Sequence, residues 1–214
     1  MLNQLIALTN KDDFWGNWHF RLEQAQFRGD TLTFIVSTFM DYPPTEKTLQ
    51  WWLVECQRIV LESGIGQLNV PNYRINVLSE HPLLWQYEEG LHISLSGKVQ
   101  SLSTLLGDLF IAHIKVCGNW LDFNGMVAGL HWRLQKEGKA GMLLPHRLLN
   151  VYQPILEQHG LELNIEPGLE ATDGLKMLLI GNPHISPDDY RFGQVYVVAK
   201  GFSVRTVAPN SSLL

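Results

Sequence analysis

Charged residues are scarce in this 214-residue chain: Lys, Arg, Asp and Glu together make up 17% of it, against about 25% in an ordinary soluble domain. The formal net charge is −5 at pH 7. An acidic chain with few basic residues lacks the general electrostatic attraction to nucleic acids and anionic membranes that a basic chain has. We therefore expect neither a nucleic acid nor a membrane as a partner.

Cysteines and long apolar runs are also scarce. Cys56 and Cys117 are the only cysteines and form no Cys-x-x-Cys motif, which argues against a disulfide framework and a finger-type zinc site. Asp108 and Lys115 interrupt the most hydrophobic helical stretch well before the ~18 apolar residues that a membrane-spanning helix needs. Residues 1–9 contain an apolar stretch but no positively charged leader, so we expect no signal peptide. We expect a soluble, cytoplasmic protein, and nothing in the sequence indicates a cofactor.

Several local signatures of catalysis are missing. The sequence contains no Gly-x-Gly-x-x-Gly, no phosphate-binding Gly-x-x-x-x-Gly-Lys, no His-Glu-x-x-His and no Gly-x-Ser-x-Gly. These motifs mark dinucleotide-binding, nucleotide-binding, zinc-peptidase and hydrolase sites, respectively. Their absence makes an enzyme of any of these classes a less favoured hypothesis.

Short strand-like runs alternate with stretches of helical periodicity. Apolar residues at helical spacing predict helices over residues 45–62, 101–117, 124–137 and 145–158. Alternating or compact apolar runs predict strands over residues 18–26, 31–40, 73–78, 83–87, 91–96, 161–165 and 177–180. Residues 195–199 and 202–207 flank a Lys-Gly pair and predict a terminal β-hairpin.

The order of these elements indicates the fold class. The strands cluster between blocks of helix, without the βαβ rhythm of a doubly wound parallel sheet. We therefore expect an α+β fold with largely antiparallel sheets, packed by three to four helices and ending in a β-hairpin. We expect a single compact domain over residues 1–214, with a weak internal boundary at the polar, glycine-containing break near 136–141.

Four of the seven tryptophans indicate a surface for association. Trp51 and Trp52 are adjacent in a predicted helix and therefore point about 100° apart, so that one of them lies at an edge. Trp18 begins the first predicted strand and Trp15 lies three residues before it; if the strand extends back that far, the two place rings on both of its faces. Aromatic enrichment with charge depletion is typical of interface cores. The sequence favours a non-catalytic interaction or assembly protein that binds a protein partner, or forms a homodimer, through these four residues.

Two histidines and an aspartate support a second hypothesis, an enzyme or small-ligand protein. His113 and Asp122 flank the end of one predicted helix, and His131 lies in the next. If the two helices pack as a hairpin, Asp122 would orient one imidazole while the other acts as a general base or metal ligand. The structural alternative is a hydrogen-bonded histidine in the core at 113 and a surface histidine at 131.

A run of basic residues supports a third hypothesis, an anion-binding module. Residues 131–147 contain four cations against only Glu137, namely Arg133, Lys136, Lys139 and Arg147. A phosphate or the acidic edge of a partner fits such a run, and a solvated helix face is the structural alternative.

One loop also contains potential metal ligands. His184 precedes Asp188 and Asp189 in a segment dense in turn-forming residues. These residues offer only two ligand types, which is fewer than a closed site needs, and an ordinary connecting loop is the alternative.

Overall fold

The chain divides into two compact units. The computed structural model describes residues 1–10, 18–40, 50–67, 69–71, 74–181, 184–185, 195–209 and 211–213. The first unit combines Met1–Glu80, Gly174–Pro183 and Phe192–Leu214, and the second combines His81–Asp173 and His184–Arg191. This division differs from the expected single compact domain, and the boundary expected near 136–141 falls inside the second unit.

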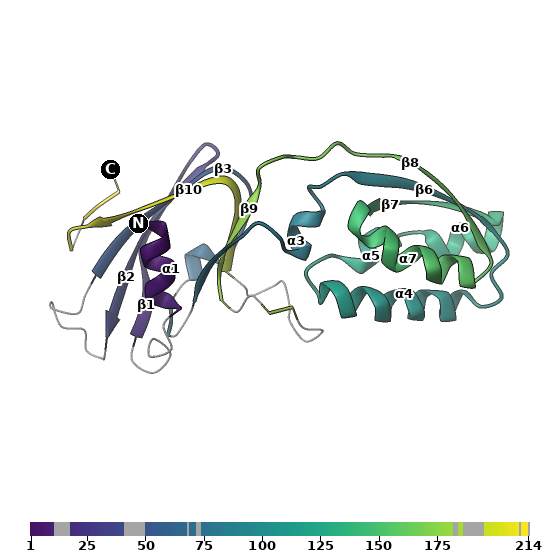
Figure 1. Ribbon diagram of the computed structural model, residues 1–214, viewed down its shortest axis with the longest axis horizontal. Coiled ribbons are helices and arrows are strands. Elements are labelled where there is room, and N and C mark those ends of the chain that lie inside the picture. Colours follow the sequence, from purple (N-terminus) through teal and green to yellow (C-terminus); the bar gives the residue numbers. More distant parts are fainter. Residues whose placement is uncertain are drawn as a thin grey trace. The chain divides into compact units, whose positions relative to one another are not determined.

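The first unit is an antiparallel sheet that carries a short helix. Its strands lie in the order β4-β1-β2-β3-β10-β9-β5, and α1 packs against β5 and β10 (Figure 1). The elements are α1 (Leu2–Thr9), β1 (Trp18–Arg28), β2 (Thr31–Met40), β3 (Gln50–Ser63), the 3-10 helix η1 (Ile65–Gln67), β4 (Asn69–Pro71), β5 (Ile75–Leu78), β9 (Lys176–Ile180) and β10 (Val195–Val207). The hairpin predicted over residues 18–40 is confirmed as β1 and β2.

Both faces of this sheet are buried at its centre. Phe34, Val54 and Val197 belong to the core beneath α1, while the intervening Ile35 and Tyr196 are also buried. Neighbouring residues of a strand point to opposite faces, so the central strands need apolar side chains at successive positions. This double burial accounts for part of the low charge of the chain.

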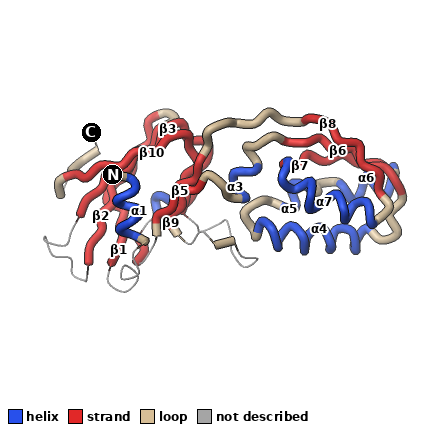
Figure 2. Tube along the Cα trace, viewed as in Figure 1, coloured by secondary structure: helices blue, strands red, loops and turns tan. Residues whose placement is uncertain are grey.

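The helix predicted over residues 45–62 is wrong, because the structure has strand β3 at Gln50–Ser63. β3 pairs with β2 on one side and β10 on the other, and both β3 and β10 are drawn as strands in Figure 2. Several apolar residues of β3 recur at helical spacing, but Trp52, Val54 and Cys56 also alternate, and all three are buried. Pairing on both edges, together with the strand preference of aromatic and β-branched residues, overrides the helical pattern.

The terminal hairpin is also wrong. Residues 195–207 form one continuous strand, β10, in which Ala199 pairs with Ile59 and Gly201 with Gln57. Gly201 is not among the glycines with positive φ, so no two-residue turn forms there. The long strand β3 provides hydrogen-bonding partners on both sides of the Lys-Gly pair.

The second unit is a three-stranded antiparallel sheet with helices on one face. The strand order is β7-β6-β8, and Figure 1 shows the helices gathered on a single side of these strands. Its elements are α3 (Pro82–Trp85), β6 (Gly90–Gly97), α4 (Leu102–Cys117), α5 (Phe123–Met126), α6 (Leu130–Glu137), β7 (Lys139–Pro145), α7 (His146–Gln158) and β8 (Leu161–Pro167).

Most of the second unit matches the sequence-based expectation. The helix predicted over residues 101–117 is confirmed as α4, with the Ser101 hydroxyl accepting a hydrogen bond from the Thr104 amide. The strand predicted at 83–87 is instead α3, which is capped by His81. β7 was not predicted, because Lys136, Gly138 and Gly141 resemble a loop. Overall, the α+β fold with antiparallel sheets is confirmed, and no helix among the described residues is long and apolar enough to cross a bilayer.

Arg58 generates a prediction about stability. It is the one non-glycine residue with positive φ among those the structure describes, at φ 55°, and a side chain disfavours this conformation by about 1–2 kcal/mol. We expect Arg58→Gly to raise the free energy of unfolding by about 1 kcal/mol, because glycine adopts this φ without strain. Urea denaturation measures the change.

Arg205→Gly is the matched control. Arg205 lies in the extended part of β10, where glycine weakens a strand by about 1 kcal/mol. Equal destabilisation by the two substitutions would contradict the assignment of strain to Arg58.

Candidate functional site

The outer face of the sheet in the second unit carries polar side chains. Along β6, Leu91, Ile93 and Leu95 belong to the core with the helices, whereas His92 and Ser94 are exposed and Ser96 is half-buried. This is the alternation of a sheet with one covered and one open face. The alternating pattern of residues 91–96 already predicts such a wet face from the sequence.

Strand register arranges the outer residues in three rows across the sheet. Lys139, Ser96 and Glu162 form the first row, Gly141, Ser94 and Asn164 the second, and Leu143, His92 and Glu166 the third. The middle row has only a glycine and a serine on β7 and β6. The surface therefore has a depression at this point, because these two strands carry no large side chain in the middle row.

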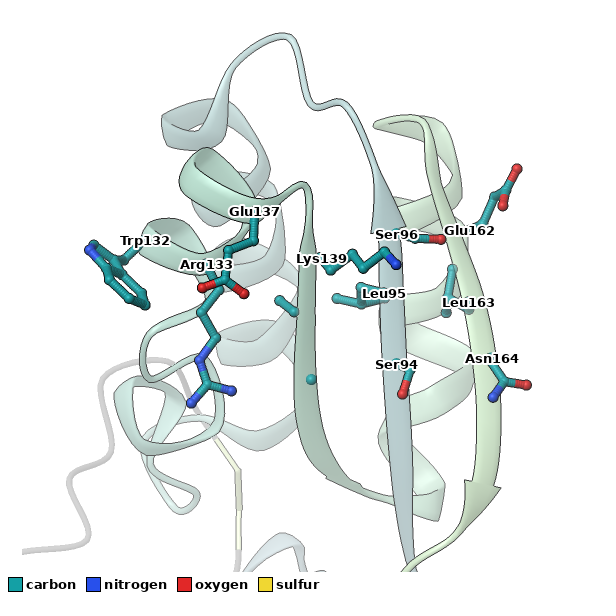
Figure 3. A pocket seen from close by; sticks show the side chains of 12 residues that line it. Ser94, Leu95, Ser96, Trp132, Arg133, Glu137, Lys139, Glu162, Leu163 and Asn164 are labelled. Carbon is teal, nitrogen blue, oxygen red and sulfur yellow. The ribbon is translucent and has the colours of Figure 1, made fainter.

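A groove of about 700 Å³ lies over this part of the sheet. Residues of β6, β7 and β8 line it, and α6 contributes Trp132, Arg133 and Glu137. Figure 3 shows the three strands side by side, with the α6 residues beside β7 and the Lys139 side chain extending toward β6. Trp132 is 50% exposed.

The four charged residues around the groove sum to zero net charge, and no two of them form an ion pair. Arg133 and Lys139 are cationic, and Glu137 and Glu162 are anionic. No ion pair joins any two of these four described residues. The groove therefore offers both signs of charge to a ligand.

The four cations predicted to form an anion-binding site do not gather at one place. Arg133 and Lys139 line the groove, but Lys136 lies over the Trp132 ring with its Nζ 4.9 Å from the centroid. Arg147 bonds to Glu88, with its Nε 2.7 Å from Oε2. The structure thus brings two of the four cations to one cavity, where two carboxylates accompany them.

The predicted catalytic residues do not assemble a reactive site. His113 is buried and bonded at both nitrogens: Nε2 lies 3.1 Å from the Leu121 carbonyl oxygen and Nδ1 lies 2.8 Å from the Tyr152 hydroxyl. Because the carbonyl only accepts, Nε2 carries the proton, and the hydroxyl donates to Nδ1. Both nitrogens are thus occupied within the protein.

The other two members of this set have separate roles. Asp122 caps α5, accepting a hydrogen bond of 3.0 Å from the Asn124 amide. His131 is exposed on α6, and among the described residues no hydrogen bond, ion pair or ring contact joins it to His113 or Asp122. The geometry therefore agrees with the alternative in which His113 is a structural histidine of the core.

The tryptophans chosen from the sequence do not form a described surface. Trp51 and Trp52 lie on opposite faces of β3 and are only 8% and 4% exposed. The Trp52 Nε1 donates to the Thr38 hydroxyl at 3.0 Å. Trp15 and the side chain of Trp18 lie outside the described residues. Trp132, for which the sequence pattern indicated no role in association, is an exposed tryptophan beside the groove.

The remaining candidate ligands and nucleophiles are not assembled either. His184 is exposed, and Asp188 and Asp189 lie outside the described residues. No group of three or more potential metal ligands occurs among the residues that the structure describes. Cys56 and Cys117 are buried, and burial raises the pKa of each thiol to about 12, which leaves no reactive thiolate at neutral pH.

Comparisons with known proteins assign this chain to no family. No family model matches the chain, and no curated protein or solved structure is significantly similar to it.

Two buried histidines of the second unit predict how its stability depends on pH. Burial lowers the pKa of His113, although the hydrogen bond to Leu121 and the charge of Asp122 oppose this effect. Burial also lowers the pKa of His81 to about 4. An unfolded histidine titrates near about 6.5, so the unfolded chain binds more protons below that pH. We expect the free energy of unfolding, measured with urea, to fall between pH 7 and pH 5.

His81→Asn isolates one contribution. Asparagine keeps an oxygen that can cap α3 but does not titrate. The substitution should remove about 2 kcal/mol of the decrease in unfolding free energy at pH 5. Stability that stays constant or rises as the pH falls would contradict the neutral, buried state of these rings.

Proposed function

We propose that this protein is a non-catalytic interaction module that binds a protein segment on the outer face of β7-β6-β8. The observation that carries the proposal is the groove of about 700 Å³ on a sheet face that helices cover only from the other side. The partner is another protein or a second copy of this chain.

The chemistry of the groove favours a segment that carries both signs of charge. Lys139 and Glu162 stand in one row on strands that flank β6, and two inter-strand spacings amount to about 10 Å. A carboxylate near Lys139 and a cation near Glu162 would each gain an ion pair. Ser96 offers a hydrogen bond between these two positions, and Ser94 and Asn164 offer further ones in the adjacent row.

Trp132 supports a protein partner in particular. Tryptophan and arginine are enriched among the residues that dominate the binding energy of protein interfaces. Trp132 and Arg133 are adjacent on α6 and both line the groove. We expect Trp132 to provide the apolar contact, while the strands provide polar contacts.

A substitution that fills the groove tests the proposal. Ser94 lies in the low middle row, and Ser94→Trp places a large ring there. Peptides are selected from a random phage-displayed library against the wild-type protein, and their affinities for both proteins are measured by fluorescence anisotropy. We expect Ser94→Trp to weaken binding at least about tenfold, because truncating or blocking an interface centre costs about 2 kcal/mol or more.

Ser203→Trp provides the matched control, since Ser203 is exposed on strand β10 of the first unit. It should leave the affinities unchanged. Selected peptides that bind Ser94→Trp as tightly as the wild type would show that the groove is not the binding surface.

A further inference from the structure

Strand β8 forms an open edge of the sheet in the second unit. The strand order β7-β6-β8 gives β8 a partner strand on one side only, and Figure 3 shows its Glu162 and Asn164 side chains on the side away from β6. At the opposite edge, α6 contacts β7. An edge strand presents unpaired N–H and C=O groups, which can pair with a strand of another chain.

The hydrogen-bonding pattern indicates which backbone groups of β8 are unpaired. The Gly90 amide of β6 donates to the Leu169 carbonyl on the β8 side, whereas the Gly97 amide donates on the β7 side. Because this direction alternates along a strand, the even-numbered residues of β6 bond to β8. Leu163 and Ile165 lie opposite odd-numbered residues, so their amides and carbonyls point away from β6. No other hydrogen bond reaches these groups among the described residues.

The side chains of β8 alternate between an apolar and an acidic row. Leu163 packs against the core on the helix side, and Ile165, two residues further on the same face, is 38% exposed. Glu162, Asn164 and Glu166 lie on the other face and are exposed. The Asn164 amide donates to the Glu166 carboxylate at 2.9 Å. A further strand would therefore meet apolar side chains on one face and carboxylates on the other.

Charge decides which kind of strand fits this edge. Residues 157–173 contain five carboxylates and no Lys or Arg, and neither Glu162 nor Glu166 forms an ion pair with a described residue. Opposite charges across two paired strands stabilise the pairing, and like charges destabilise it. Two copies of β8 paired antiparallel about Asn164 would place Glu162 against Glu166. The edge therefore favours a basic partner over a second copy of this chain.

We propose that β8 binds an extended segment of another protein, in which Lys or Arg alternates with apolar residues, as a fourth strand of this sheet. The backbone of the segment pairs with Leu163 and Ile165. Its cations lie beside Glu162 and Glu166, and its apolar side chains cover Ile165. This inference goes beyond the function proposed above, because it concerns the edge of the sheet and not the groove on its face.

A short peptide with this pattern tests the proposal. Fluorescein-labelled Lys-Val-Lys-Val-Lys-Val-Lys is titrated into the full chain and followed by fluorescence anisotropy, with Glu-Val-Glu-Val-Glu-Val-Glu as the control of opposite charge. We expect the lysine peptide to bind saturably and the glutamate peptide to bind at least about tenfold more weakly.

Amide exchange distinguishes the edge from the groove. Exchange with solvent is measured by NMR on the ¹⁵N-labelled full chain, with and without saturating unlabelled lysine peptide. We expect the Leu163 and Ile165 amides to exchange at least about tenfold more slowly in the complex, because each gains a hydrogen bond there. A peptide bound only in the groove would leave these two amides unprotected.

Charge reversal on β8 tests the role of the carboxylates. The double substitution Glu162→Lys and Glu166→Lys should weaken binding of the lysine peptide at least about tenfold and reverse the preference between the two peptides. Loss of folding would not reverse that preference. The double substitution Glu80→Lys and Glu89→Lys changes the net charge equally at two exposed positions outside β8, and it should keep the wild-type preference.

Three results would overturn the proposal. The first is the absence of saturable binding by the lysine peptide. The second is binding that leaves exchange at Leu163 and Ile165 unchanged. The third is protection of these two amides in the free chain as its concentration rises, which would indicate that a second copy occupies the edge.

Discussion

One-sided burial of the sheet is the constraint on which the second unit depends. The inward residues of β6 and β7 pack with Leu105 and Leu109 of α4 and with Leu148 and Leu156 of α7. Because strand side chains alternate, the same pairing places Ser94, Ser96 and Lys139 together on the other side. The polar groove and the apolar core are therefore two results of one strand register, and a shift by one residue would exchange them.

The core of this unit also contains a satisfied polar pair, His113 and Tyr152. The ring and the hydroxyl are buried between α4 and α7 and bond to each other at 2.8 Å. Buried polar groups are compatible with stability when every donor and acceptor is paired. Both ring nitrogens of His113 are hydrogen-bonded within the protein. This histidine therefore serves the packing of the core, although histidine is a common catalytic residue.

The accuracy of sequence-based prediction differed with the source of the signal. α4 was predictable because Ser101 caps a long apolar stripe, and the open face of β6 was predictable because His92 and Ser94 alternate with buried residues. Strand β3 was not predictable from the sequence, because Trp52 and Cys56 fit both helical spacing and strand alternation. Only the pairing of this segment with β2 and β10 decides in favour of a strand.

The candidate site was harder to predict than the fold. Its residues come from α6 and from three strands that are separated in the sequence, and β7 resembles a loop. The tryptophans at 51 and 52 suggested a surface because of a helix that does not form. An association surface is not needed to explain all of the low charge of the chain. Part of it follows from the burial of the central strands of the first unit on both faces.

Photo-crosslinking in the cells that naturally make this protein tests the central claim most directly. Trp132 is replaced with p-benzoylphenylalanine, and Phe27, an exposed aromatic residue of the first unit at 55% exposure, is replaced in the same way as the control. A binding surface over β7-β6-β8 predicts a discrete crosslinked protein at position 132 and none at position 27. The absence of a crosslinked product at position 132, or the same products at both positions, would contradict it.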